Sequence, residues 1–236
     1  MYRYLASMLM VGVLMAACHS SLAQREFPTN KPQGPLNTLT EQEKADGWEL
    51  LFDGESFAGW EWDRGEWSIT DEGIIVSQNG PGHLFSRDTY RNFKLKVDVC
   101  AYDVAVPKQR FGNSGVFVRG IKTGGAFPQG YEVQVDPYDM NNPTGGIYGQ
   151  APGTLLVDEE GNWKPEAFLE VHEGKWLEME VLCIDNHFIV WINGEITLDW
   201  VDERNQFPEP GHIALQNHHE SDVVLFTNIK IKNLDD

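Results

Sequence analysis

The sequence predicts an all-β domain, built as a sandwich or barrel of antiparallel strands. Short runs in which apolar and polar residues alternate recur from Trp48 onward, and Gly, Pro, Asn and Asp separate them. Many short strands with regular turns are typical of sandwiches and barrels. No window keeps a helical period and no strand–helix–strand unit is present, which excludes an α/β fold. No longer period repeats along the chain, which disfavours a propeller or a solenoid.

Residues 1–23 are predicted to be an export signal. Arg3 supplies a positive start, and the run from Leu5 to Ala17 is apolar apart from Ser7. This run is shorter than the ~20 apolar residues that a membrane span needs, and it fits the core of a signal peptide.

Two cleavage sites compete at the end of this signal. The segment MAAC at 15–18 resembles a bacterial lipobox, which would place a lipid on Cys18. The segment SLA at 21–23 suits ordinary signal peptidase instead. We favour the lipobox, and we expect an exported, periplasmic protein that is anchored in the membrane through Cys18.

The mature chain is expected to be a tether followed by one domain. Residues 24–39 are rich in Pro, Gly, Asn, Thr and Gln, which predicts an extended tether. The capping-box pattern TEQE at 40–43 predicts one helical turn over 40–46, where the domain of residues 40–236 begins. Beyond it, the alternating pattern predicts strands at 48–52, 66–70, 73–77, 82–86, 92–101, 115–119, 130–136, 145–149, 154–157, 175–184, 187–193, 196–201, 211–217 and 222–232.

Charge and cysteine content narrow the function classes. The chain has 36 acidic and 18 basic residues, a formal charge of −18, so it repels phosphate backbones and nucleic-acid binding is not expected. A neutral or cationic ligand fits this charge better. Cys100 and Cys183 fall on different faces of their predicted strands, so we expect two buried thiols, although an exported protein would allow a disulfide.

Three predicted strands each present a polar row opposite an apolar one. Side chains alternate across a strand with a period of two. The core-facing row of each strand would then hold Val116 and Val118, the odd residues of 131–135, or Ile213 and Leu215. The opposite rows hold Asn113, Phe117 and Arg119; Glu132, Gln134 and Asp136; and Gln216 and His218. Amides, Arg and nearby aromatic residues such as Trp60 and Tyr148 suit sugar hydroxyls and the apolar sugar face, so these rows predict a sugar site.

The spacing of the acidic residues disfavours a conventional glycosidase with two carboxylates. Glu132 and Asp136 lie ~13 Å apart along a regular strand. Retaining and inverting mechanisms need carboxyl groups ~5–9.5 Å apart. A cluster of Glu132, Asp136 and His218 remains an alternative site for a divalent cation, but no zinc spacing is recognised. His218 and His219, as neighbours on a strand, are expected to face opposite ways.

Several segments, in order along residues 39–234, resemble the 3-keto-disaccharide hydrolase family. This family is also described as 3-keto-glucoside 1,2-lyase and 3-keto-2-hydroxyglucal hydratase. The segments that carry the resemblance are LTEQEKADGWELLFDG at 39–54, GW at 59–60, NSGVFVRG at 113–120, GYEVQVD at 130–136, GGIYGQAPG at 145–153, GKW at 174–176, VWINGE at 190–195 and GHIALQNHHESDVVLFTNIKIKNL at 211–234. The resemblance implies a concanavalin-A-like jelly-roll sandwich of two antiparallel sheets.

The resemblance also implies the chemistry. In a glucoside oxidised at C3, the ketone acidifies the C2 proton, so a base can remove it and the C1 substituent can leave; water can add afterwards. We expect His218 or Glu132 to be the base and Arg119 to bind the carbonyl or enolate oxygen. Asn113, Gln134, Asp136, Tyr148, Gln216 and Trp60 would contact the sugar. The substrate would come from a separate sugar oxidoreductase.

The sequence departs from the family pattern at two positions. The family usually has Gly where His219 stands, and it usually has Arg where Thr227 stands, and both departures are expected near one strand end. One interpretation of these two departures is an altered substrate specificity. A different alternative is a non-catalytic carbohydrate-binding module, because jelly rolls carry many functions.

Overall fold

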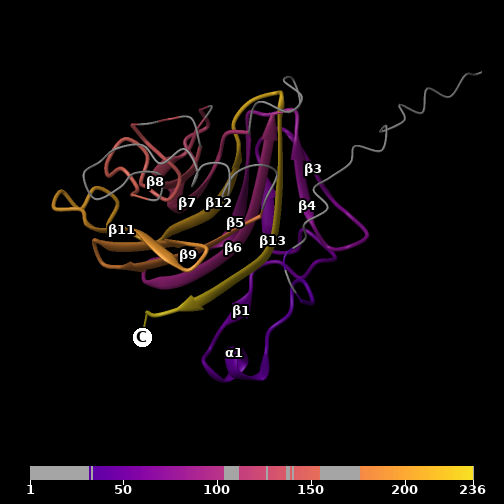
Figure 1. The fold of residues 1–236 in the computed structure, drawn as a ribbon, viewed down its shortest axis with the longest axis horizontal. Coiled ribbons are helices and arrows are strands. Elements are labelled where there is room, and N and C mark those ends of the chain that lie inside the picture. Colours follow the sequence, from indigo (N-terminus) through magenta and orange to yellow (C-terminus); the bar gives the residue numbers. More distant parts are fainter. Residues whose placement is uncertain are drawn as a thin grey trace, which may run out of the picture.

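The structure is a computed structural model that describes residues 32, 34–103, 112–125, 127–136, 139, 141–154 and 176–235 (Figure 1). The expected export signal, Cys18 and most of the tether lie outside the described residues. Within the described part of the chain, no helix is both long enough and apolar enough to span a bilayer.

Two antiparallel sheets form the domain. The smaller sheet has the order β2 (Trp60–Trp62), β5 (Gly82–Tyr90), β12 (Gly211–Asn217), β7 (Ser114–Ile121) and β8 (Gln129–Val135). The larger sheet has the order β11 (Glu195–Val201), β10 (His187–Ile192), β9 (Leu177–Ile184), β6 (Phe93–Asp103), β13 (Asp222–Asn233), β4 (Ile75–Gln78) and β3 (Glu66–Ile69), and β1 (Glu49–Leu50) also pairs with β13. The predicted all-β sandwich of two antiparallel sheets is therefore confirmed.

The core lies between the two sheets, and alternation along the strands fills it. Val116 and Val118 of β7, Val133 of β8 and Leu215 of β12 are fully buried there, as predicted. They pack with residues of the larger sheet such as Val181. Because side chains of a strand alternate between faces, the intervening residues of β7, β8 and β12 lie on the outer face of the smaller sheet.

The chain enters the domain through the predicted helical turn. Helix α1 (Glu41–Ala45) starts at Thr40, and both halves of the capping box are present. The helix lies well away from β7, β8 and β12 (Figure 1). The last residues of the expected tether pack on the domain, since buried Asn37 donates a hydrogen bond to the Gly73 carbonyl and accepts one from the Asn228 backbone N–H. Contacts with the domain thus begin before residue 40.

Two predicted strands differ from the structure, and one observed strand was not predicted. Residues 145–149 form a turn around an isolated bridge at Ile147, because Gly145 and Gly149 have positive φ angles of 84° and 68° that a strand does not allow. Thr154 lies outside any strand, and residues 155–157 lie outside the described part. The strand β2 was not predicted, because its three residues carry too short a pattern.

Cys100 and Cys183 are both buried and no disulfide joins them, as expected. Cys183 lies in the core between the sheets, whereas Cys100 belongs to a second cluster on the other side of the larger sheet. Burial raises the pKa of the Cys183 thiol to about 12, so this sulfur is an unreactive packing group.

Candidate functional site

A cavity of about 440 Å³ lies on the outer face of the smaller sheet, and we call it the hollow. It brings together six of the residues that the sequence predicted for a sugar site. These are Asn113, Glu132, Gln134, Tyr148, Gln216 and His218. Phe117, Phe127 and Asp139 also line it.

Strand register explains why these side chains converge. In the ladder between β7 and β8, Phe117 lies opposite Glu132 and Gly115 lies opposite Gln134. In the ladder between β12 and β7, Ala214 lies opposite Phe117, which places Gln216 one step further along the same face. Polar residues on three adjacent strands therefore meet over a floor of Phe85, Phe117 and Ala214.

Glu132 is the ionisable group at the centre of this arrangement. Burial raises the pKa of its carboxyl to about 8, although a hydrogen bond from Gln216 acts in the opposite direction. Gly115 makes room for this side chain, because a Cβ atom there would lie 2.4 Å from Glu132 Oε1. A carboxyl with a pKa near neutrality is suited to general acid–base catalysis.

Amide oxygens surround this carboxyl. Asn113 Oδ1, Gln134 Oε1 and Gln216 Oε1 are buried, and none accepts a hydrogen bond from the residues that the structure describes. Buried polar atoms in folded proteins are nearly always hydrogen-bonded. The three oxygens are therefore placed to accept hydrogen bonds from the hydroxyl groups of a ligand.

Asp136 lies beside the hollow without lining it. Its Oδ2 accepts a hydrogen bond of 2.8 Å from Asn113 Nδ2. This contact fixes which way the Asn113 amide points, and it leaves Oδ1 of that amide buried without a hydrogen-bond donor among the described residues. Asp136 is accordingly a positioning residue, and a direct sugar contact is not what its geometry supports.

His218 follows the end of β12 and stands at the edge of the hollow. Burial and, to a smaller extent, neighbouring His219 together lower the pKa of its imidazole to about 4. The expectation that the two histidines face opposite ways is wrong. Strand β12 ends at Asn217, so alternation no longer applies, and His218 Nδ1 lies 2.9 Å from His219 Nε2.

Arg119 is not in the hollow, and its predicted role as the carbonyl or enolate ligand is wrong. The ladder between β7 and β8 is irregular after Val118, and Arg119 has a φ of 51°. This bulge turns the side chain to the inner side of the sheet, where it is 1% exposed. A bulge adds one residue to a strand, so the alternation that placed Arg119 with Glu132 fails at this point.

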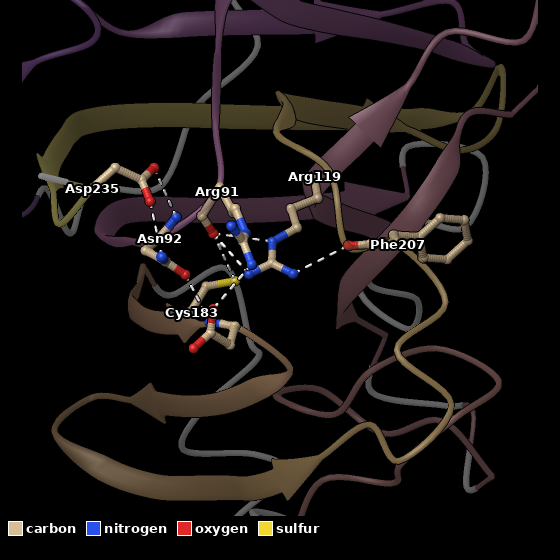
Figure 2. A network of polar contacts seen from close by, with 7 residues as sticks. Arg91, Asn92, Arg119, Cys183, Phe207 and Asp235 are labelled. Atoms are coloured by element: carbon tan, nitrogen blue, oxygen red, sulfur yellow. Dashed lines mark hydrogen bonds and ion pairs between the residues drawn. The ribbon is translucent and has the colours of Figure 1, made fainter.

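The Arg119 guanidinium instead holds loops together inside the domain (Figure 2). Nε and Nη2 donate to the Arg91 carbonyl at 3.0 and 2.8 Å, and Nη1 donates to the Phe207 carbonyl at 3.1 Å. Figure 2 shows how Asn92, the next residue, in turn meets Asp235 near the end of the chain, at 2.8 Å. The arginine is a structural clamp.

Of the two aromatic residues predicted to contact the sugar, one lies in the core and the other lies at the hollow. Trp60 is 2% exposed in the core, and its indole N–H donates to the Leu51 carbonyl at 2.6 Å, so its predicted sugar contact is wrong. Tyr148 is 51% exposed at the rim of the hollow. Its backbone N–H donates to the Glu132 carbonyl, which ties the rim to β8.

Sequence reasoning missed His83. It lies opposite Gln216 on β5 and is fully buried among the rings of Phe117, Phe85 and Phe127. Burial lowers the pKa of this imidazole to about 4, and neither ring nitrogen has a hydrogen bond within the described residues. Alternation with core residue Leu84 was the signal that could have placed His83 on the outer face.

Thr227, which stands where the family usually has Arg, lies away from the hollow. It is fully buried in β13 of the larger sheet, where its hydroxyl donates to Asn37 Oδ1 at 3.1 Å. The expectation that both departures lie near one strand end is therefore wrong. A large arginine at this position would have to displace the Asn37 contact.

The fold resembles solved structures that are described as candidate glycosyl hydrolases or as a carbohydrate recognition domain. A candidate glycosyl hydrolase from Parabacteroides distasonis ATCC 8503 is 26% identical with a TM-score of 0.66, and the match covers 85% of this chain and 100% of that chain. A second one from the same organism is 24% identical with a TM-score of 0.59, over 79% and 99% of the chains. The carbohydrate recognition domain of Emp46p shares the fold at 12% identity and a TM-score of 0.50, over 84% and 94%. No curated protein matches the chain.

These likenesses confirm the jelly-roll sandwich, and the candidate glycosyl hydrolase at 26% identity supports a function on carbohydrates. The sequence itself matches a family described as the 3-keto-alpha-glucoside-1,2-lyase-like domain, over residues 47–232. That match covers all five strands of the smaller sheet, on which the hollow lies, from β2 to β12. The chain belongs to the family of 3-keto-alpha-glucoside-1,2-lyase-like domains.

Proposed function

We propose that this protein cleaves glucosides that carry a ketone at C3, by removing the C2 proton and eliminating the C1 substituent. The observation that carries the proposal is the Glu132 carboxyl, whose pKa is raised to about 8 inside a hollow of unpartnered amide oxygens. Family membership supports the same chemistry.

The proposed reaction needs one strong base at the sugar. The Glu132 carboxylate takes the proton from C2, and the C–H electrons form an enolate with the C3 ketone. The enolate then restores the ketone, a C1–C2 double bond forms, and the C1–oxygen bond breaks. The leaving oxygen takes up a proton, and water can later add across the double bond. A carboxylate whose conjugate acid has a raised pKa is a stronger base, which favours Glu132 over His218 for this step.

The amides supply recognition of the sugar. Asn113, Gln134 and Gln216 offer three oxygens to hydroxyl donors. Such a site rejects analogues that lack the hydroxyl groups, because its buried oxygens would then stay unpaired. The rows that face the hollow thus fit a small polyol ring.

The arrangement does not favour a conventional glycosidase. The second acidic residue in the hollow is Asp139, and both of its oxygens accept hydrogen bonds from its own loop, from Asn142 Nδ2 at 2.8 Å and from the Asn141 backbone N–H at 2.9 Å. These bonds lower the pKa of the Asp139 carboxyl against the effect of burial. A carboxylate held in this way organises a loop and is a poor partner for Glu132 at an anomeric carbon.

The decisive experiment compares the wild type with Glu132→Gln on one 3-keto-glucoside and on its unoxidised parent. Proton abstraction by a positioned base contributes ~10²–10⁴-fold in rate, so we expect turnover to fall by that order while substrate binding changes little. In D₂O, the wild type should also exchange the C2 proton, as followed by NMR. Exposed Glu66→Gln, on β3, is the matched control. Equal cleavage of the parent glucoside would contradict the proposal.

A second candidate function is non-catalytic sugar binding. Phe127 and Tyr148 are 43% and 51% exposed beside the hollow, and exposed rings can stack on the apolar face of a sugar. This candidate predicts that Tyr148→Ala abolishes binding while Glu132→Gln changes neither binding nor any reaction. Retention of full turnover by Glu132→Gln would favour it.

We also propose that the protein is exported to the periplasm and anchored there through a lipid on Cys18. A separate sugar oxidoreductase would supply the C3 ketone, since elimination requires a substrate that is already oxidised. Replacing Cys18 by Ala should release the protein from the membrane fraction into the soluble periplasm, as followed by fractionation. A wild-type protein that is soluble and begins at Gln24 would contradict the anchor.

A further inference from the structure

We propose that His218, His219 and Asp222 bind a divalent transition-metal ion at the edge of the hollow. One nitrogen from each imidazole and one carboxylate oxygen of Asp222 all lie within 4.8 Å of one another. The three side chains come from five consecutive residues at the turn between β12 and β13.

The distance between the two imidazoles suits a shared ion. His218 Nδ1 and His219 Nε2 lie 2.9 Å apart. Two nitrogen ligands at ~2.1 Å from one ion are ~3.0 Å apart when they lie at a right angle, and ~3.4 Å apart in the tetrahedral geometry that zinc prefers. A neutral imidazole has one nitrogen with a lone pair. If both facing nitrogens carry their lone pairs, they converge on a cation with very little movement.

The turn holds the carboxylate in place for this purpose. Asp222 is 2% exposed, and its Oδ2 accepts a hydrogen bond of 2.9 Å from the His219 backbone N–H. The Asp222 N–H donates to the His219 carbonyl, and Asn217 Nδ2 donates to the Asp222 carbonyl at 3.1 Å. Hydrogen bonds that orient the ligands raise the affinity of a metal site. The cluster is thus pre-organised by the backbone of a single turn.

The donor set indicates the class of metal. Two imidazoles and one carboxylate that leave further positions open suit first-row transition ions. Calcium and magnesium prefer sets made of oxygen atoms. Zn²⁺ and Ni²⁺ are therefore the probes that this site should bind, and Ca²⁺ should not bind to it.

An ion here would bear on the proposed function, and this part of the inference rests on that function. His218 belongs both to this cluster and to the lining of the hollow. Arg119, the expected stabiliser of the enolate oxygen, is buried elsewhere. A cation at the edge of the hollow would supply the positive charge that favours the enolate.

The test uses the full chain without an affinity tag, stripped with a chelator and titrated with ZnCl₂ by calorimetry. We expect one ion per chain, and we expect His219→Gln to weaken the affinity at least ~10-fold. His219 is exposed, so this variant should fold. His187→Gln is the control, because His187 faces Asp199 at 2.6 Å outside the site and its loss should leave Zn²⁺ binding unchanged. Equal binding by the wild type and His219→Gln, or equal binding of Ca²⁺, would overturn the metal site.

A second measurement separates this inference from the proposed function. Cleavage of a 3-keto-glucoside is followed with chelated and with Zn²⁺-loaded protein. Zinc binding at His219 without any cleavage would leave the metal site standing and remove the proposed function. Cleavage at the same rate with and without chelator, in a protein that binds no Zn²⁺, would remove the metal site and leave the proposed function standing.

Discussion

The outer faces of the two sheets both carry a cavity and a buried carboxyl group, yet they differ in how their charges are compensated. On the larger sheet, a cavity of about 570 Å³ is lined by Lys96, Asp98, Glu178 and Lys230, among others. On the smaller sheet, the hollow contains neither Lys nor Arg among its described lining residues. Size and polarity alone do not distinguish the two.

The charges on the larger sheet neutralise one another. Lys94 and Lys96 both reach Glu180, at 2.8 and 3.7 Å, and Lys230 pairs with Glu43. Burial raises the pKa of Asp98 to about 6, while a hydrogen bond from Asn228 opposes that rise. In the hollow, burial raises the pKa of Glu132 further, to about 8, with only Gln216 acting against it.

This difference shows what marks a functional face in this protein. Ion pairs between neighbouring strands, such as the ladder of lysines around Glu180, stabilise a sheet. A carboxyl without a cation and amide oxygens without hydrogen-bond donors cost free energy, and a protein that keeps them uses them on a ligand. The hollow is therefore the candidate site, and the ladder on the larger sheet is structural.

The largest effect on turnover is expected from a substitution of Gly115 in the hollow. In Gly115→Ala, the new methyl group would lie 2.4 Å from Glu132 Oε1 and 2.7 Å from its Cγ. Displacing a catalytic group by about 1 Å can lower turnover ~10²-fold, which we expect here on a 3-keto-glucoside. The double variant with Glu132→Gln should be no worse than Glu132→Gln alone. Additive losses would show that Gly115 acts independently of the carboxyl.

Arg119→Lys tests whether the buried clamp is separate from the hollow. A lysine cannot replace the three hydrogen bonds to the Arg91 and Phe207 carbonyls, so we expect a loss of ~3 kcal/mol in the free energy of unfolding. For a chain of this size that loss lowers the Tm by ~6–12 °C in a thermal melt. Turnover at low temperature should persist. Exposed Arg204→Lys should leave the Tm unchanged, and an inactive Arg119→Lys with an unchanged Tm would return Arg119 to the chemistry.

The smallest effect concerns pH, and it sharpens the contrast between the two carboxyl groups. A raised pKa means that the folded state holds its proton longer, so stability is lost as pH rises from the unfolded pKa through the folded one. For Asp98, whose pKa is about 6, this loss is nearly complete by pH 7, whereas for Glu132 it continues through about 8. Between pH 7 and 8, the wild type should lose about 1 kcal/mol more than Glu132→Gln. Urea titrations at both pH values measure this, with Asp98→Asn expected to match the wild type.

Alternation along the strands could be predicted from the sequence wherever the strands are regular. It correctly separated Val133 from Glu132 and Gln134, and Leu215 from Gln216, because one face of each strand is buried. It failed at Arg119, where the bulge shifts the phase by one residue. The signal for this bulge lay on other strands, since the Arg119 backbone packs against Gly130 and Gly211, which a side chain would block.

The turns that complete the site could not be predicted in this way. The meeting of His218, His219 and Asp222 depends on the backbone of a turn, where no period relates residue number to direction. Gly80 approaches this turn closely, and a Cβ atom there would lie 2.2 Å from Asn217 Oδ1. Contacts between segments so far apart in the sequence leave no local pattern in either one.

The clamp around Arg119 joins segments that the ribosome synthesises at different times. Asp235, the last residue described, accepts a hydrogen bond from the Asn92 side chain. Arg91, which precedes Asn92, accepts hydrogen bonds from the Arg119 guanidinium through its carbonyl. During translation the chain emerges from its N-terminus, so residues 91 and 119 are synthesised long before the segment that fixes their loop. Chains that stop short of β13 would also lack the central partner of β6. A nascent chain can therefore complete this domain only after the segment up to Asp235 has been synthesised.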